Sequence, residues 1–133
     1  NSAENEETLT GQLRQKKYIS NIQHIALRTN DIFKLSKQIQ DLGLETLKIS
    51  DNYYDDIDAK FGLETSILEK IKKNNILYDE DNEGYFFQIY TTLINNSFFF
   101  EFVQRNQDYE GYGANNAIFR ISAQKKLING RQT

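Results

Sequence analysis

Residues 76–105 read ILYDEDNEGYFFQIYTTLINNSFFFEFVQR, and this stretch decides the fold. Three runs rich in aromatic and β-branched residues are separated by two turn sequences, Asp81-Asn82-Glu83-Gly84 and Asn95-Asn96. Aromatic and β-branched residues favour strands, whereas Asp, Asn and Gly favour the turns between them. The stretch therefore predicts a hairpin, with strands over 76–79 and 85–92, followed by a third strand over 97–105.

The residues before this stretch predict a strand, a helix, a second strand and an irregular helical segment. The first strand is expected over 21–28, the second over 44–49, helical segments over 53–61 and 64–74, and a closing helix over about 116–127. Apolar residues at three- and four-residue steps predict the first helix, from Ile32 to Leu42. Thr29 or Asn30 is its expected cap, and Gly43 its stop. This order predicts an α+β domain whose mostly antiparallel sheet carries helices on one face.

The composition describes one ordinary domain of 133 residues, with 38% hydrophobic and 13% aromatic residues to form a core. A net charge of -3 gives no basic surface, which argues against nucleic acid and anionic membranes as partners. The polar, acidic start shows no signal peptide, and no apolar run approaches the roughly 20 residues of a spanning helix. We therefore expect a cytoplasmic protein. Cysteine is absent, which excludes disulfides and thiolate sites.

Three polar residues interrupt otherwise apolar strands. His24 lies within NIQHIAL, Gln88 within YFFQIY and Glu101 within FFFEFV. A carboxylate among aromatic side chains is costly unless it pairs, takes up a proton or binds a metal. His24 is the one histidine of the chain, so no site can hold two histidines of this chain alone.

Simpler interpretations of these residues stay open at this point. His24 could be a hydrogen-bonded histidine of the core or the surface. Glu101 could face solvent on a strand whose other face, with Phe98, Phe100 and Phe102, is the buried one. The acidic cluster over 55–58 and the lysines over 70–73 are typical of solvated helix faces.

A series of motifs in fixed order resembles the C-terminal part of the 4-hydroxyphenylpyruvate dioxygenase family. The motifs are Gln23-His24-Ile25-Ala26-Leu27, Thr29-Asn30-Asp31-Ile32, Tyr53-Tyr54-Asp55, Ile76-Leu77, Glu83-Gly84-Tyr85, Gln88-Ile89-Tyr90-Thr91, Phe99-Phe100-Glu101, Gln104-Arg105, and Gly111-Tyr112-Gly113-Ala114 with Asn116. They span roughly residues 19–124. Their shared order makes the resemblance far more specific than any single motif.

The resemblance implies a fold and a division of the chain. The family has the vicinal-oxygen-chelate, or glyoxalase-like, fold, in which paired βαβββ modules form an open barrel. Residues 21–133 are then expected to form one such module with its closing helix, which is half of the barrel. Residues 1–20 are expected to be a linker or the end of a preceding module.

The resemblance also implies a non-haem Fe(II), or another divalent metal, held by two histidines and one glutamate. His24 matches the second histidine and Glu101 the glutamate. The family's first histidine lies on the preceding module, so a missing module or a second chain is expected to pair with this one and supply it. The matching substrate-binding residues are Gln88, Tyr90, Phe99, Tyr112 and Asn116, with Gln23 beside the metal.

Two functions are expected from this resemblance, and a third interpretation is a half-barrel that only dimerises to cover its sheet edges. The first function is an oxidoreductase of tyrosine catabolism, which uses O₂ for oxidative decarboxylation and ring hydroxylation of an aromatic 2-oxo acid. The second is that of a dioxygenase-like domain in a bacterial dehydroshikimate-dehydratase-type fusion, where the domain is structural, regulatory or of altered specificity. The pair Asn116-Ala117 resembles these fusion proteins somewhat more closely. Ala117 and Ile118 replace the phenylalanine and lysine of members that act on 4-hydroxyphenylpyruvate, which changes the lid over the substrate.

Overall fold

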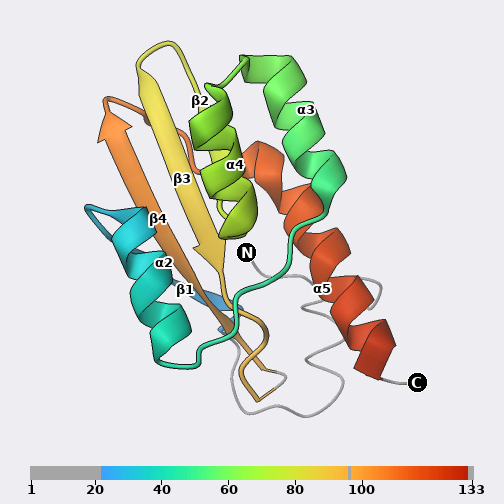
Figure 1. The fold of residues 1–133 in the computed structure, drawn as a ribbon. Coiled ribbons are helices and arrows are strands. Elements are labelled where there is room, and N and C mark those ends of the chain that lie inside the picture. The colour runs from blue at the N-terminus through green and yellow to red at the C-terminus, as the bar shows by residue number, and fades with distance from the viewer. Residues whose placement is uncertain (1–21, 96, 132–133) are drawn as a thin grey trace.

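The computed structural model describes residues 22–95 and 97–131, so the linker expected over 1–20 lies outside the described residues. The elements are β1 (His24–Arg28), α2 (Ile32–Asp41), α3 (Asp51–Phe61), α4 (Thr65–Lys73), β2 (Leu77–Glu80), β3 (Gly84–Tyr90), β4 (Phe99–Gln107), the short 3₁₀ turn η1 (Ala114–Asn116) and α5 (Ala117–Arg131) (Figure 1). This order confirms the α+β class. None of the helices in the described ranges has both the length and the apolar character that crossing a membrane requires.

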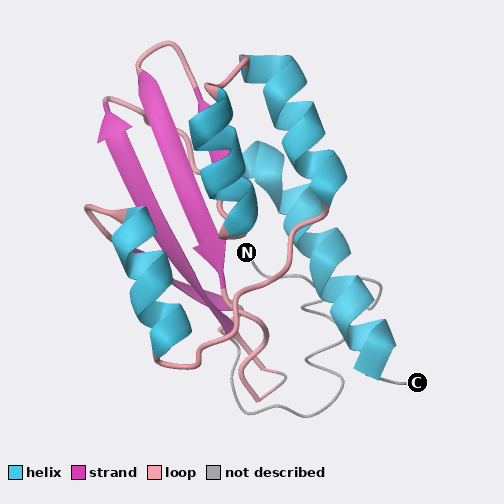
Figure 2. Ribbon diagram, viewed as in Figure 1, coloured by secondary structure: helices cyan, strands magenta, loops and turns pink. Residues whose placement is uncertain are grey.

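The four strands form one open sheet in the order β1-β4-β3-β2 (Figure 2). β1 runs parallel to β4, whereas the β4–β3 and β3–β2 pairs are antiparallel, which confirms the mostly antiparallel prediction. The register places Glu101 of β4 beside Ala26 of β1 and beside Tyr90 of β3. The sheet therefore brings three segments that are far apart in the sequence together around Glu101.

Helices pack on both faces of β3 and β4, which corrects the expectation that all helices share one face, whereas β1 is exposed. On one face Phe87 of β3 packs edge-on against Phe33 of α2, with ring centroids 5.5 Å apart. On the other face Arg120 of α5 lies over Phe99, 5.2 Å from its ring centroid. Because β3 and β4 carry aromatic side chains on both faces, each face needs a cover that excludes water.

Two local predictions are wrong. Residues 44–49 do not form a strand, because they meet the sheet only at the end of β3, through one bridge between Thr46 and Thr91. The chain then turns away, and the Ile49 N–H bonds the Asn75 side chain instead of a strand. Helix α2 is capped by Asp31, not by Thr29 or Asn30, since the Asp31 carboxylate accepts a hydrogen bond from the Lys34 N–H.

Candidate metal centre and ligand cavity

His24 and Glu101 converge on one face of the sheet. His24 lies two residues before Ala26, so its side chain projects from the same face as Glu101. The His24 Nε2 and Glu101 Oε2 atoms are 3.5 Å apart. Glu101 is buried beside Phe99, and the imidazole stacks on the Phe99 ring with centroids 5.2 Å apart. The interpretation that Glu101 faces solvent is therefore wrong.

Neighbouring amides fix the orientation of both side chains. Gln88 Nε2 donates to Glu101 Oε1 at 2.7 Å, which leaves Oε2 directed at His24. Gln23 Oε1 lies 3.0 Å from His24 Nδ1. When Gln23 Oε1 accepts a hydrogen bond from Nδ1–H of the neutral imidazole, Nε2 carries no proton and its lone pair faces the Glu101 carboxylate. Two acceptors in this position repel each other unless a cation lies between them.

The pair fits part of a metal site. Two ligands about 2.1 Å from one ion and at right angles stand about 3 Å apart, close to the observed separation. Within residues 22–95 and 97–131, no third His, Cys, Asp or Glu joins the pair to make a group of three. The described residues thus bring one imidazole and one carboxylate together.

A chain of buried hydrogen bonds continues from Glu101 to helix α3. Gln88 Oε1 accepts from Asn116 Nδ2 at 2.7 Å, and Tyr53 donates to Asn116 Oδ1 at 2.9 Å. The Tyr53 hydroxyl also accepts from the Tyr78 N–H at 2.7 Å. Burial raises the pKa of Tyr53, so its hydroxyl stays neutral and serves as a donor. This network holds Gln88, and through Gln88 the carboxylate, in one geometry.

A cavity of about 390 Å³ adjoins the His24–Glu101 pair. Its lining comes from β1, β3, β4, the loop after β4 and α5, and consists of His24, Ala26, Phe86, Tyr90, Glu101, Val103, Arg105, Tyr112, Gly113, Ala114, Ala117 and Arg120. Tyr90 and Tyr112 thus line the cavity. Gln88, Phe99 and Asn116 are almost fully buried beneath the lining, where they position it.

Tyr90 forms a wall of the cavity next to the carboxylate. Its hydroxyl accepts a hydrogen bond from Gln88 Nε2 at 2.9 Å. Burial and then the Glu101 charge raise the pKa of Tyr90, and the Arg120 guanidinium opposes that rise. Tyr90 therefore presents a neutral hydroxyl at neutral pH.

The sequence interpretation gave no role to Tyr53, Gly113 or Arg120, which the structure places at the site. Gly113 lies so close to Gln88 that an added Cβ would stand 2.3 Å from Gln88 Oε1. For Arg120 a signal was present. Polar residues at 116, 120 and 124 recur at four-residue steps, which places them on one side of the closing helix.

Tyr109 anchors the loop that carries Tyr112 and Gly113. Its hydroxyl donates to Asp79 Oδ2 at 2.7 Å and accepts from the Gly113 N–H at 3.1 Å. Its ring stacks on Phe86 with centroids 5.0 Å apart. Burial and then the hydrogen bond to Asp79 raise the pKa of Tyr109 to about 12.

We expect Tyr109→Phe to lower the free energy of unfolding by about 1–3 kcal/mol, because it leaves a buried carboxylate without its donor. Wild-type stability falls as pH rises from about 10 to 12, where the unfolded tyrosine is ionised and the folded one is not. In the variant, the free energy of unfolding should fall less steeply over this pH range, by up to about 1.4 kcal/mol per pH unit. Urea unfolding at several pH values measures both effects. Exposed Tyr112→Phe is the control, and equal slopes in the two variants would contradict the role of Tyr109.

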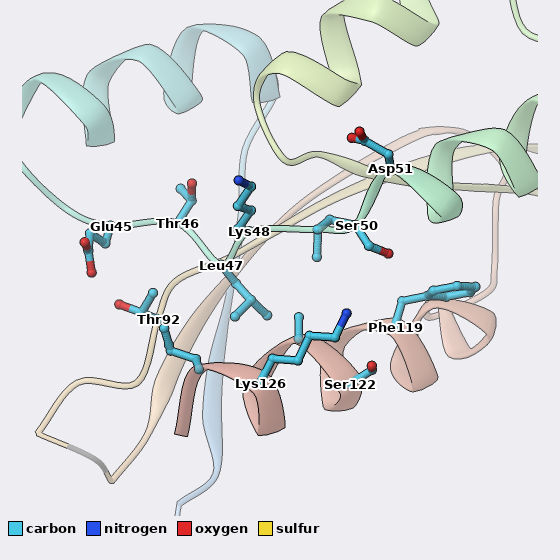
Figure 3. A pocket seen from close by; sticks show the side chains of 13 residues that line it. Glu45, Thr46, Leu47, Lys48, Ser50, Asp51, Thr92, Phe119, Ser122 and Lys126 are labelled. Atoms are coloured by element: carbon cyan, nitrogen blue, oxygen red, sulfur yellow. The ribbon is translucent and has the colours of Figure 1, made fainter. Parts of the chain in front are cut away.

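A second cavity, of about 650 Å³, lies between the 45–51 segment and α5 (Figure 3). It contains none of the residues that the sequence predicts for the site. Its two lysines, Lys48 and Lys126, are exposed, and the acidic residues Glu45 and Asp51 offset their charge. It therefore favours no charge class of ligand.

Comparison with known proteins identifies the relatives of this chain. No protein-family model matches it. A 3-dehydroshikimate dehydratase of Pseudomonas putida is 36% identical over 98% of this chain, and a 4-hydroxyphenylpyruvate dioxygenase of Tetrahymena thermophila is 37% identical over 71% of it. These matches cover only 21% and 25% of the two relatives. The chain thus spans about a quarter or less of each.

Solved structures agree with the sequence matches. A xylose isomerase-like TIM barrel/4-hydroxyphenylpyruvate dioxygenase fusion protein matches 79% of the chain with a TM-score of 0.76 and 39% identity, over 17% of its own length. A mutant 4-hydroxymandelate synthase from Streptomyces coelicolor matches with a TM-score of 0.68 and 28% identity, over 30% of its length. The open sheet is the half-barrel of the glyoxalase-type fold. The chain is thus a dioxygenase-like module that is similar, over most of its own length, to 4-hydroxyphenylpyruvate dioxygenases.

Proposed function

We propose that this module provides two ligands, His24 and Glu101, of a site for Fe(II) or another divalent metal. The 3.5 Å approach of the imidazole Nε2 to a carboxylate oxygen is the observation that carries the proposal. The hydrogen bonds that His24 donates to Gln23 and that Glu101 accepts from Gln88 support it, because outer partners of this kind orient metal ligands.

The finer proposal is the reaction, oxidative decarboxylation and ring hydroxylation of an aromatic 2-oxo acid by O₂. A bound Fe(II) supplies open coordination positions for the 2-oxo acid and for oxygen. Glu101 holds its place through Gln88, and Tyr90 contributes an aromatic wall and a neutral hydroxyl. Ala117 leaves room where a larger residue would fill the cavity, so the ring of the substrate need not be that of 4-hydroxyphenylpyruvate.

The third ligand is proposed to come from a second module or a second chain, because this chain has one histidine. β1 is an edge strand of the sheet, and its Ile25 and Leu27 side chains are 39% and 44% exposed. An edge strand with exposed apolar side chains is a suitable place for another sheet to pack. Ile25 and Leu27 project from the face opposite His24, so it is strand pairing along the β1 edge that would set the second histidine beside His24.

A second candidate function is that of a domain in a larger dehydratase fusion, where the module is structural, regulatory or of altered specificity. The Pseudomonas putida relative and the fusion structure both favour it. The sequence upstream of this module in its gene distinguishes the candidates. A TIM-barrel domain there supports the fusion, and another βαβββ module supports the dioxygenase.

The test is an anaerobic titration of the full chain with Fe(II) or Co(II), with molecular size measured in the same samples. We expect one ion per chain or one per dimer. His24→Ala should lower the affinity at least tenfold, about 1.4 kcal/mol, because the carboxylate then has no imidazole partner.

The matched control is Arg28→Ala, an exposed residue at the other end of β1. It should leave the titration unchanged. Binding that is equally tight in wild type and His24→Ala would contradict the metal site, and binding to neither would show that this chain does not hold the metal alone. Turnover with 4-hydroxyphenylpyruvate and O₂ then tests the finer proposal.

A further inference from the structure

Arg120 is a cation in the lining of the cavity that has no acidic partner among the described residues. Its guanidinium lies 5.2 Å from the Phe99 ring centroid and 5.7 Å from that of Tyr90. The ion pairs within the described ranges are His24–Glu101 and Lys72–Asp51, so Arg120 pairs with no carboxylate there. A half-buried guanidinium of this kind keeps its capacity to bind two oxygens of an anion.

The position of Arg120 is built into the fold. Its Nη1 donates to Gln124 Oε1 at 2.9 Å, one helical turn along α5. Gln124 is fully buried, and its Nε2 has no hydrogen-bond partner in the described structure. Burying the Gln124 amide is costly, and in the described structure the hydrogen bond from Arg120 offsets part of that cost. Gln124 therefore acts to hold the guanidinium over the aromatic wall.

The charge of the cavity favours an anion. Its lining contains two guanidinium groups, those of Arg105 and Arg120, against the single carboxylate of Glu101. Arg105 stacks on Phe86 and Tyr112 and donates to the Gly111 carbonyl oxygen. Arg120 stacks on Phe99 and Tyr90, and its guanidinium keeps N–H groups beyond the one that donates to Gln124. Ala117, one turn before Arg120 on α5, leaves space beside the Arg120 guanidinium and not beside that of Arg105.

We propose that Arg120 determines specificity by binding a carboxylate of an aromatic acid. A metal held by His24 and Glu101 would bind other oxygens of the same molecule. His24 and Arg120 both line this cavity, so one small molecule bound there can contact both groups. This inference deepens the proposed function, on which it rests for the metal end of the ligand.

The test uses the metal-free full chain, so that it does not depend on metal binding. The probes are 4-hydroxybenzoate, which is an anion at pH 7, and 4-hydroxybenzyl alcohol, which has nearly the same shape and no charge. Titration calorimetry should give at least tenfold tighter binding of the anion to wild type. Arg120→Gln should remove that preference and leave binding of the alcohol within about threefold, and Arg120→Lys should restore part of it.

Lys125→Gln, an exposed cation of the same helix, is the matched control and should keep the preference. Near-UV circular dichroism checks that each variant is folded. Equal affinity of wild type for the two probes, binding of neither, or loss of the preference in Arg105→Gln but not in Arg120→Gln would overturn the proposal. A failed metal titration with a retained anion preference would instead contradict only the metal site.

Discussion

Gly113→Ala is expected to lower the free energy of unfolding by about 2–5 kcal/mol, from two separate causes. Gly113 has a φ of 62°, in the left-handed region where a residue with a Cβ is strained by about 1–2 kcal/mol. The new Cβ would also stand 2.3 Å from Gln88 Oε1 and 2.6 Å from Gln88 Cδ. Gln88 cannot move aside cheaply, because hydrogen bonds to Glu101, Tyr90 and Asn116 hold it.

Gly62→Ala separates the two causes. Gly62 has a φ of 60° at the end of α3, and an added Cβ would meet nothing within 4 Å. This control carries only the backbone strain, so we expect it to cost about 1 kcal/mol. Urea unfolding of both variants gives the difference, which is the steric cost at Gln88. Equal losses in the two variants would show that the loop yields to the new methyl group and that Gln88 is not confined.

The sequence predicted the sheet well because its strands are marked by aromatic runs and by turn residues. The hairpin turn illustrates this, since Asp81 Oδ1 accepts from the Glu83 and Gly84 N–H groups as a short Asp-rich turn should. The prediction of a strand over residues 44–49 was wrong, because a short apolar run has the same pattern whether it pairs along its whole length or contacts a sheet at one bridge. The extent of pairing depends on the partner strand, which local patterns do not contain.

The site was predictable at its centre and less so around it. His24 and Glu101 were identifiable because each is a polar residue in an apolar strand, where it needs a partner. Gln88 carries the same signal, but Asn116 and Tyr53 belong to the site through hydrogen bonds between distant segments, and no spacing in the sequence gives such a bond. Asn116 was expected to contact substrate, and the structure instead buries it behind Gln88.

Gln88→Glu is expected to destabilise the protein by about 3 kcal/mol or more at pH 7. The substitution keeps the shape of the side chain but replaces the Nε2 donor, 2.7 Å from Glu101 Oε1, by a carboxylate oxygen. Two buried carboxylates in contact cannot both be ionised without a large cost. Gln104→Glu is the matched control, because Gln104 also lies in the sheet but its amide contacts Asn106 and the Ile32 N–H.

The sign of the pH dependence follows from the new carboxyl group. Burial and the Glu101 charge should raise its pKa in the folded state above the value of about 4.3 in the unfolded chain. The free energy of unfolding of Gln88→Glu is then close to that of wild type below about pH 4, and it falls below the wild-type value as pH rises toward 7. Below that pH the protonated carboxyl group at position 88 donates to Glu101 as the amide did. A difference from wild type that does not change with pH would contradict contact between the two carboxyl groups.

A divalent metal should relieve the same repulsion if it binds where His24 and Glu101 meet. Gln88→Glu adds a carboxylate beside the pair, so the variant offers three ligands where wild type offers two. A ligand that binds only the folded state raises stability by mass action. Co(II) at pH 7 should therefore raise the urea midpoint of Gln88→Glu more than that of wild type, and adding His24→Ala should remove the gain. A gain that persists without His24 would place the ion on the two carboxylates alone, whereas no gain at all would mean that the three side chains do not share a cation.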